Sequence, residues 1–133
     1  MINTHDLMLG NWYYDAKYNA NTQVTSYLLL QPIFNTCDGI SVTTKILKKI
    51  GFEEYEDSPL EGNFFRYWDK DCKYKLDVRN FWTNSRREWY VHIDNDVCNT
   101  IGSGEFNYVH ELQNLVRVIT RYDLPIIKEM LDE

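Results

Sequence analysis

The sequence predicts an α+β fold, with an antiparallel sheet formed by an N-terminal hairpin and a three-stranded meander, and two main helices packed on one face. Short runs of aromatic and β-branched residues between turn residues predict the strands. Two stretches with apolar residues at helical spacing predict the helices. The middle strands follow one another with only short turns between them, which favours an antiparallel meander. At 133 residues we expect one α+β domain spanning residues 1–133.

The first two strands are predicted near the N-terminus. GNWYYD reads as a short aromatic strand, and QVTSYLLLQ reads as a second strand that ends at Pro32. The polar segment KYNANTQ between them is typical of a turn. The FNTCDG segment that follows is expected to be a loop because it is polar and contains an Asp-Gly turn signal.

The first helix is predicted in VTTKILKKIGF, with both ends marked. The hydroxyl of Thr43 can accept a hydrogen bond from the first turn, which makes it the expected N-cap. Gly51 is the expected left-handed residue after the last turn, followed by Phe52 folding back. Ile46, Leu47 and Ile50 form the stripe that we expect to be buried. The next segment, EEYEDSPLEGN, is expected to be an exposed acidic loop.

The meander is predicted in FFRYWD, CKYKLDVRNFW and REWYVHID. A turn closed by Lys70-Asp71 would place Tyr67 opposite Tyr74 and Phe65 opposite Leu76. The turn at residues 83–86 would place Leu76 opposite Ile93 and Val78 opposite Val91. Alternate residues of a strand face opposite sides, so one face is predicted to carry the core. Its members are Phe65, Tyr67, Tyr74, Leu76, Val78, Trp89, Val91 and Ile93.

The second helix is predicted at Asn107–Arg121 with Asn107 as its N-cap. Val109, Leu112, Leu115, Val116 and Ile119 recur at helical spacing and should face the core. His110, Asn114 and Arg117 are predicted to lie on the opposite side, as a polar stripe whose purpose stays open. Gly102 and Gly104 are expected to give flexibility before this helix. LPIIKEMLDE is expected to add one or two final turns.

Composition narrows the class of protein. The formal net charge is −6, which disfavours non-specific binding to nucleic acid because such binding requires neutralisation of phosphates. Three widely spaced cysteines favour reduced thiols over a disulfide framework. The N-terminus lacks the features of a signal peptide, and no apolar run is long enough to cross a bilayer. We therefore expect a cytoplasmic protein without a membrane partner.

Several segments together resemble a family of small uncharacterised proteins. They are GNWYYD, VTTKILKKIGF, the aromatic meander and YVHELQNL. Members of that family are encoded by gut anaerobic bacteria, their prophages and mobile elements. This sequence departs from the family pattern at Thr44-Lys45, at Glu111 and in the FNTCDG loop. The resemblance implies a phage or mobile-element accessory protein, and it implies no particular chemistry.

Metal ligation is weakly indicated by the sequence. DNDVCNTIGSGE places Asp94, Asp96 and Glu105 at three ligand positions of an EF-hand loop. Cys98 stands at the fifth position and Asn99 stands where that loop needs glycine. The cysteines lack the close pairs of a structural zinc site. We predict no metal and no cofactor.

A histidine and a carboxylate are predicted to meet on the outer face of the meander. The register places His92 directly opposite Asp77, with Lys75 opposite Asp94 beside them. A carboxylate can orient a histidine as a general base. No serine or cysteine is placed beside this pair by the register, and charged cross-strand pairs are an ordinary finish for a solvated face.

The same outer face is predicted to combine aromatic and basic side chains. Four large aromatic residues on a solvated face indicate a covered or binding surface. Aromatic residues beside basic ones also stack bases in some single-strand binders. Asp77, Glu88 and Asp94 share the face and leave little local positive charge. The aromatic set is Phe64, Trp68, Phe81 and Tyr90, and the basic set is Arg66, Lys73, Lys75 and Arg79.

These observations lead to three hypotheses. The first is a non-enzymatic protein-interaction module of phage or mobile-element type, which uses the outer face to bind an unknown protein partner. The second is single-stranded nucleic-acid binding on the same face. The third is an enzyme centred on His92 and Asp77. Mimicry of nucleic acid is a minor alternative, because only EEYED is densely acidic.

Overall fold

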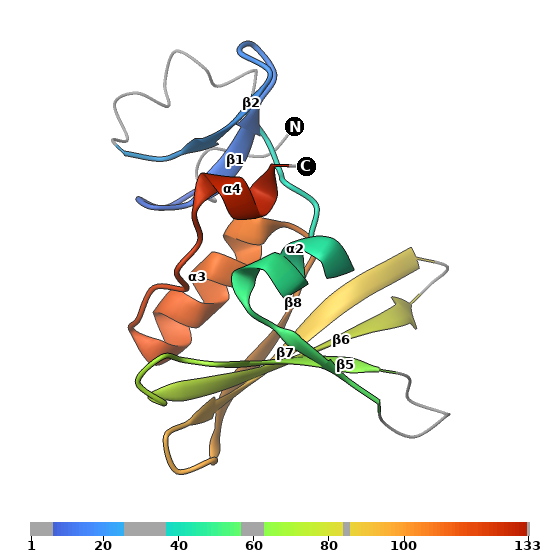
Figure 1. Ribbon diagram of the computed structural model, residues 1–133, viewed down its shortest axis with the longest axis vertical. Coiled ribbons are helices and arrows are strands. Elements are labelled where there is room, and N and C mark those ends of the chain that lie inside the picture. The colour runs from blue at the N-terminus through green and yellow to red at the C-terminus, as the bar shows by residue number, and fades with distance from the viewer. Residues whose placement is uncertain (1–6, 26–36, 57–62, 84–85, 133) are drawn as a thin grey trace.

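The computed structural model describes residues 7–25, 37–56, 63–83 and 86–132. Within these residues, the strands form two antiparallel sheets and the helices lie between them (Figure 1). The small sheet has the order β2-β1-β3 and the large sheet has the order β4-β5-β6-β7-β8. The α+β class with an antiparallel sheet is therefore confirmed. None of the helices in the described residues is long and apolar enough to cross a membrane.

The elements have the following bounds. The small sheet contains β1 (Trp12–Asp15), β2 (Ala20–Gln23) and β3 (Cys37–Asp38). The large sheet contains β4 (Glu53–Tyr55), β5 (Phe64–Trp68), β6 (Tyr74–Thr83), β7 (Arg86–Asn95) and β8 (Thr100–Phe106). The helices are α2 (Thr44–Ile50), α3 (Val109–Thr120) and α4 (Lys128–Leu131).

The large sheet has the predicted buried face, with one difference in register. Leu76 pairs with Ile93 and Val78 pairs with Val91, as expected. Tyr67, however, pairs with Leu76 and not with Tyr74, because the Asp69 amide donates to the Tyr74 carbonyl and four residues, 70–73, form the turn between them. This difference of two residues preserves which side each residue faces. All eight predicted core residues are buried.

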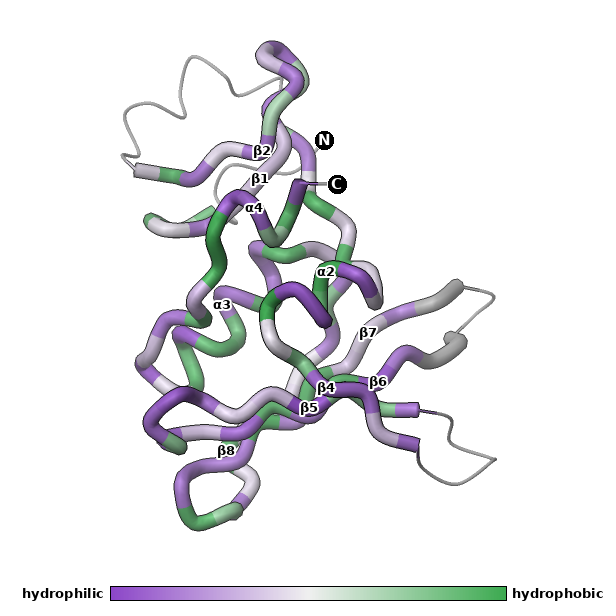
Figure 2. Tube along the Cα trace, viewed as in Figure 1, coloured by the Kyte–Doolittle hydropathy of each residue, from purple (hydrophilic) through white to green (hydrophobic). Residues whose placement is uncertain are grey.

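Two strands of the large sheet were not predicted. β4 lies in the segment expected to be an acidic loop, and it pairs with β5. β8 occupies the segment expected to be a polar loop, and it pairs with β7. Figure 2 shows why periodicity missed β4, since this edge strand is hydrophilic along its length. Acidic residues on an edge strand also discourage pairing with another chain.

The glycines of β8 have a packing role and not the predicted role in loop flexibility. A Cβ atom added at Gly102 would lie 2.6 Å from Cδ1 and 2.8 Å from Cγ2 of Ile119. A Cβ atom added at Gly104 would lie 2.7 Å from Cδ2 of Leu115. Glycine at both positions therefore lets α3 approach the sheet closely enough to bury its apolar side.

The small sheet differs from the predicted hairpin. β2 begins at Ala20 in the expected turn, and Trp12 of β1 pairs with Gln23 at its end. Residues 26–31 of the expected second strand lie outside the described residues. Cys37 and Asp38 belong to the expected FNTCDG loop, yet they pair with β1 as the short strand β3.

Helix α2 has the predicted ends. The hydroxyl of Thr43 accepts a hydrogen bond from the Ile46 amide at 3.2 Å. Gly51 has a φ of 123°, and its amide donates to the carbonyl groups of Leu47 and Lys48. The Phe52 amide donates to the Leu47 carbonyl at 2.9 Å, so that Phe52 folds back into the core.

Helix α3 begins two residues later than predicted. Tyr108, not Asn107, occupies the N-cap position. The carboxylate of Glu111 accepts hydrogen bonds from the amides of Asn107 and Tyr108 at 2.9 Å and 3.0 Å. An acidic side chain also stabilises this end of the helix dipole. The fixed start aligns Val109, Leu112 and Val116 with the large sheet, where they are buried.

The polar stripe of α3 was wrongly predicted to lie away from the interior. Figure 2 shows hydrophobic and hydrophilic residues alternating along this helix. Of that stripe, His110 is only 2% exposed, and Asn114 and Arg117 are half-buried. The neighbouring Gln113, which was not assigned to the stripe, is 8% exposed. Gln113 accepts a hydrogen bond from the Trp12 amide at 2.9 Å and donates to the Gly10 carbonyl at 3.2 Å. The polar side of α3 therefore binds the small sheet, because two layers pack on this helix from different sides.

The close approach of α3 to β8 gives a first prediction. Gly102→Ala should destabilise the protein by about 1–3 kcal/mol, because overpacking forces Ile119 from its position. Urea unfolding would measure this change. Ser103→Ala, on the opposite face of the same strand, should change stability by less than about 0.5 kcal/mol. Adding Ile119→Ala to Gly102→Ala should cost less than the two single changes together. Strict additivity would contradict the proposed contact.

The link between α3 and the small sheet gives a second prediction. Gln113→Ala leaves the buried Trp12 amide without its acceptor, which should cost about 1–3 kcal/mol. Hydrogen exchange should accelerate in β1 more than in β6 and β7, because the small sheet loses its attachment first. Val118→Ala, on the exposed side of α3, is the matched control. Equal acceleration in both sheets would show that Gln113 has no specific role in this attachment.

Candidate functional site

The outer face is the side of the large sheet that points away from the helices. Within the described residues, no element covers it, and the small sheet packs on the far side of the helices (Figure 1). Its central row runs across all five strands as Glu53, Arg66, Asp77, His92 and Ser103. The neighbouring positions carry most of the predicted site residues, namely Phe64, Trp68, Lys75, Arg79 and Tyr90.

Basic side chains of the outer face lie against its aromatic rings. The Arg66 guanidinium lies 5.0 Å from the Phe64 ring centroid and 5.5 Å from that of Tyr55. Arg79 lies 4.9 Å from the Phe64 centroid. The Tyr55 and Phe64 rings stack with a centroid distance of 5.4 Å. These cation–π contacts hold the rings in a fixed arrangement at the β4–β5 side of the sheet.

Trp68 extends the aromatic surface to the end of β5. It pairs with Lys75, whose ammonium lies 5.6 Å from the Trp68 ring centroid. Trp68 is 46% exposed and Tyr55 is 38% exposed. Tyr90 is half-buried. Phe81 pairs with Glu88 in the backbone register, and its side chain lies outside the described part of the chain.

The charges of the outer face neutralise one another. Asp77 accepts two hydrogen bonds from Arg66, at 2.7 Å from Nε and 3.1 Å from Nη2. Lys75 lies 3.6 Å from Asp77 and 3.0 Å from Asp94. The hydrogen bonds that the Arg66 guanidinium donates to Asp77 raise the pKa of Arg66 against the opposing effect of burial. The result is a continuous ion-pair network across three strands.

Asp94 is the most buried acid of this network. Burial by itself raises the pKa of Asp94, but the hydrogen bonds from Lys75 and Thr100 and the positive charge of Lys75 outweigh it. The net result is a pKa below the ordinary value of 3.8. Asp94 therefore stays ionised near neutral pH and anchors Lys75 beside Trp68.

His92 and Asp77 lie opposite each other, as predicted, but each is engaged elsewhere. Asp77 forms its ion pairs with Arg66 and Lys75. Nε2 of His92 lies 2.9 Å from the Thr100 hydroxyl, and that hydroxyl donates to Asp94 at 3.2 Å. Because the single hydroxyl proton is used on Asp94, Nε2 must carry the hydrogen towards Thr100. This nitrogen is then not the base that the enzyme hypothesis requires.

Outer-face residues of β4 and β8 were missed from the sequence, among them Ser103 and Tyr55. Ser103 pairs with His92, and Tyr55 pairs with Phe64. Both belong to strands that were not predicted, so the register argument could not place them. Ser103 supplies a hydroxyl in the same row as His92 and Asp77, although the observed partner of His92 is Thr100.

The stretch that was compared with an EF-hand loop forms a turn and a strand. The side chain of Asn95 accepts hydrogen bonds from the amides of Val97 and Asn99 at 3.1 Å and 2.9 Å. Cys98 takes a left-handed φ of 61° in this turn. In the described ranges, no group of three or more His, Cys, Asp and Glu side chains is placed to hold a metal ion. The polar residues of this stretch serve the β7–β8 turn.

Comparison with known proteins adds no family to these observations. Neither protein-family profiles, nor curated proteins, nor solved structures gave a match to this chain.

The depressed pKa of Asp94 gives a third prediction. A carboxyl group whose pKa is lower when folded stabilises the protein above its unfolded pKa and loses this effect as pH falls through the folded value. Asp94→Asn should therefore cost about 1–2 kcal/mol near neutral pH, and less as pH falls below about 3.8. Urea unfolding at several pH values would measure the free energy of unfolding of the wild-type protein and of Asp94→Asn. Asp96→Asn in the exposed turn is the control. A cost independent of pH would contradict the assigned charge interaction.

Proposed function

We propose that this chain is a non-enzymatic protein-interaction module that binds a protein partner through its outer face. One observation carries this proposal. Trp68 and Tyr55 are substantially exposed on a sheet face that no described element covers. Large aromatic and arginine side chains dominate the binding energy of many protein interfaces. The rings here are held by neighbouring cations, so binding would cost little further side-chain entropy.

The charge arrangement favours a protein partner over single-stranded nucleic acid. Arg66 and Lys75 are paired with Asp77 and Asp94, so they have little free charge for phosphates. Bases stacking on Phe64 would also have to displace Arg66 and Arg79 from its ring. The chain as a whole carries a net charge of −6, which weakens association with polyanions further.

The enzyme alternative has less support from the same face. The Nε2 hydrogen of His92 is directed to Thr100, and the Asp77 carboxylate is taken by two cations. Ser103 pairs with His92 in the register, yet Nε2 of His92 is hydrogen-bonded to Thr100 and not to Ser103. The resemblance to small proteins of gut anaerobes and their phages supports a cytoplasmic accessory protein, which is the setting we propose.

Partner capture with matched variants tests the proposal. Tagged wild-type protein, Trp68→Ala and Tyr55→Ala would be used to capture proteins from a lysate of the source organism. We expect a partner that wild-type protein retains and that each variant loses at least tenfold. Val118→Ala truncates a more exposed apolar side chain on α3 and should retain the partner. A partner retained equally by all variants would place the interface elsewhere.

A parallel measurement separates the nucleic-acid alternative. Fluorescence anisotropy with a labelled single-stranded oligonucleotide should show no binding at physiological salt. Binding that disappears in both Trp68→Ala and Arg79→Ala would support nucleic-acid recognition and overturn the protein-partner proposal.

A further inference from the structure

A groove on the opposite side of the molecule combines an apolar floor with basic walls. It lies between the β1–β2 hairpin, the segment that enters α2, α2 itself and α4, and its volume is about 610 Å³. Pockets of roughly 300–1,000 Å³ are typical for small-molecule ligands. The groove is assembled from segments far apart in the chain, so no local sequence motif marks it. The outer face contributes nothing to its lining.

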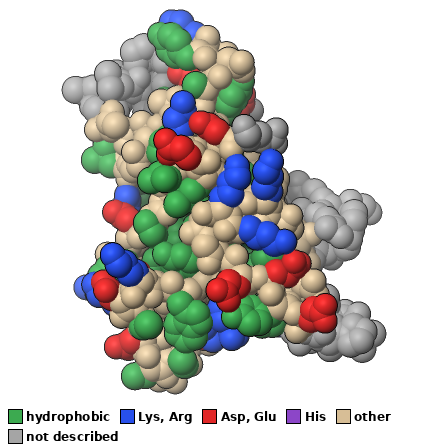
Figure 3. Space-filling model, in the orientation of Figure 1, with side chains coloured by type: hydrophobic (Ala, Val, Ile, Leu, Met, Phe, Trp, Pro, Cys, Tyr) green, Lys and Arg blue, Asp and Glu red, His purple; other side chains and the backbone are tan. Residues whose placement is uncertain are grey.

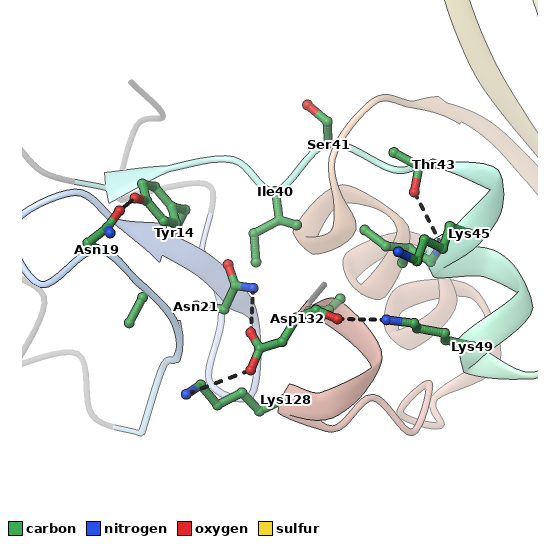
Figure 4. Close-up of a pocket in the computed structure, with 13 residues that line it drawn as sticks. Tyr14, Asn19, Asn21, Ile40, Ser41, Thr43, Lys45, Lys49, Lys128 and Asp132 are labelled. Carbon is green, nitrogen blue, oxygen red and sulfur yellow. Dashed lines mark hydrogen bonds and ion pairs between the residues drawn. The ribbon is translucent and has the colours of Figure 1, made fainter.

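The floor of the groove is formed by apolar side chains. Ile40 and Leu131 are buried members of the core, and Ile46 is partly buried against it. Tyr14 forms one end and hydrogen-bonds to the Asn19 side chain through its hydroxyl (Figure 4). A ligand with an aromatic or aliphatic body would cover this floor and remove it from water.

Basic side chains line the other side of the groove. Lys45 and Lys49 come from α2, and Lys128 comes from α4. Figure 3 shows basic side chains gathered over this region of a chain that is acidic overall. In the described part of the chain, Lys45 forms no ion pair. Its charge is therefore available to a ligand.

The chain already places an anionic group among these lysines. The Asp132 carboxylate accepts a hydrogen bond from the Asn21 side chain at 3.0 Å and lies 3.8 Å from the Lys128 ammonium (Figure 4). The Lys49 ammonium donates to the Asp132 carbonyl at 2.6 Å. In the groove, an amide group and an ammonium group thus hold a carboxylate. Amide and ammonium groups are the donors that recognise anions.

We propose that this groove binds a small organic anion, in which an apolar or aromatic body carries a phosphate or carboxylate. The body lies on Tyr14, Ile40 and Ile46. The anionic group lies between Lys45 and Lys49, near the negative charge of Asp132, whose backbone carbonyl accepts a hydrogen bond from Lys49. This site is independent of the protein partner proposed for the outer face.

The experiment uses a matched set of aromatic probes. Amide chemical shifts of the isotope-labelled full chain would be followed during titration with 1-naphthyl phosphate, 1-naphthoate and neutral 1-naphthol. We expect one or both anions to bind at least tenfold more tightly than naphthol, with the largest shifts around the groove. The better of the two anions identifies phosphate or carboxylate as the preferred group. Failure of both anions to bind, or equal binding of naphthol, would overturn the proposal.

Variants of neighbouring lysines supply the control. Lys45→Ala and Lys49→Ala should each weaken anion binding roughly tenfold, as expected for loss of a charged contact. Lys48 lies between Lys45 and Lys49 in the sequence of α2, but its ammonium is 3.3 Å from Glu54 and its side chain does not line the groove. Lys48→Ala should leave the affinity unchanged. An equal loss in Lys48→Ala would mean that only net charge matters and would overturn the site.

Asp132→Asn is expected to change the affinity for the anion in the opposite direction to the lysine variants. Removing the negative charge of Asp132 should tighten anion binding several-fold because it removes repulsion and releases Lys128, and the affinity should fall as salt rises. Weaker binding in Asp132→Asn would contradict an anion site beside this carboxylate. Lys49→Gln is a second variant that removes the charge but keeps a polar side chain able to donate to the Asp132 carbonyl, and it distinguishes loss of charge from loss of packing if Lys49→Ala loosens α4.

Discussion

Packing on both sides of α3 is the constraint on which the architecture depends. On one side, glycines at positions 102 and 104 allow Ile119 and Leu115 to approach β8 closely. On the other side, Gln113 binds the backbone of Gly10 and Trp12. The apolar side secures the large sheet through burial, whereas the polar side secures the small sheet through hydrogen bonds. A helix in this position needs both kinds of surface, because a polar group that is buried without a partner is destabilising.

This arrangement decides which surfaces remain for binding. The helices occupy one face of the large sheet, and the small sheet packs beyond the helices, so the outer face stays uncovered in the described structure. Cross-strand ion pairs and cation–π contacts hold the side chains of that face in position. Each contact is modest, but the Arg66–Asp77–Lys75–Asp94 chain links three strands and fixes the side chains around Trp68. The rigidity of this surface follows from the sheet beneath it.

The sequence was sufficient to predict features that depend on local capping residues or on the alternation of side chains along a strand. The caps of α2 follow from Thr43 and Gly51, and the core face of the meander follows from a period of two, even though one turn was predicted too short. β4 and β8 were missed because an acidic edge strand and a glycine-containing strand lack the usual apolar alternation. The burial of His110 was missed because helical periodicity assumes one packed side. The groove could not be predicted, since its walls come from distant segments.

The two candidate surfaces differ in how much of their charge is available. On the outer face, the cations at positions 66 and 75 are paired with acids, so this face offers shape and aromatic area more than charge. In the groove, three lysines accompany one carboxylate that is paired with Lys128, and Lys45 forms no ion pair within the described residues. A net charge of −6 argues against binding to polyanions only as an average over the chain. Charges are screened over about 8 Å at physiological salt, so a small anion inside the groove responds mainly to its lysines.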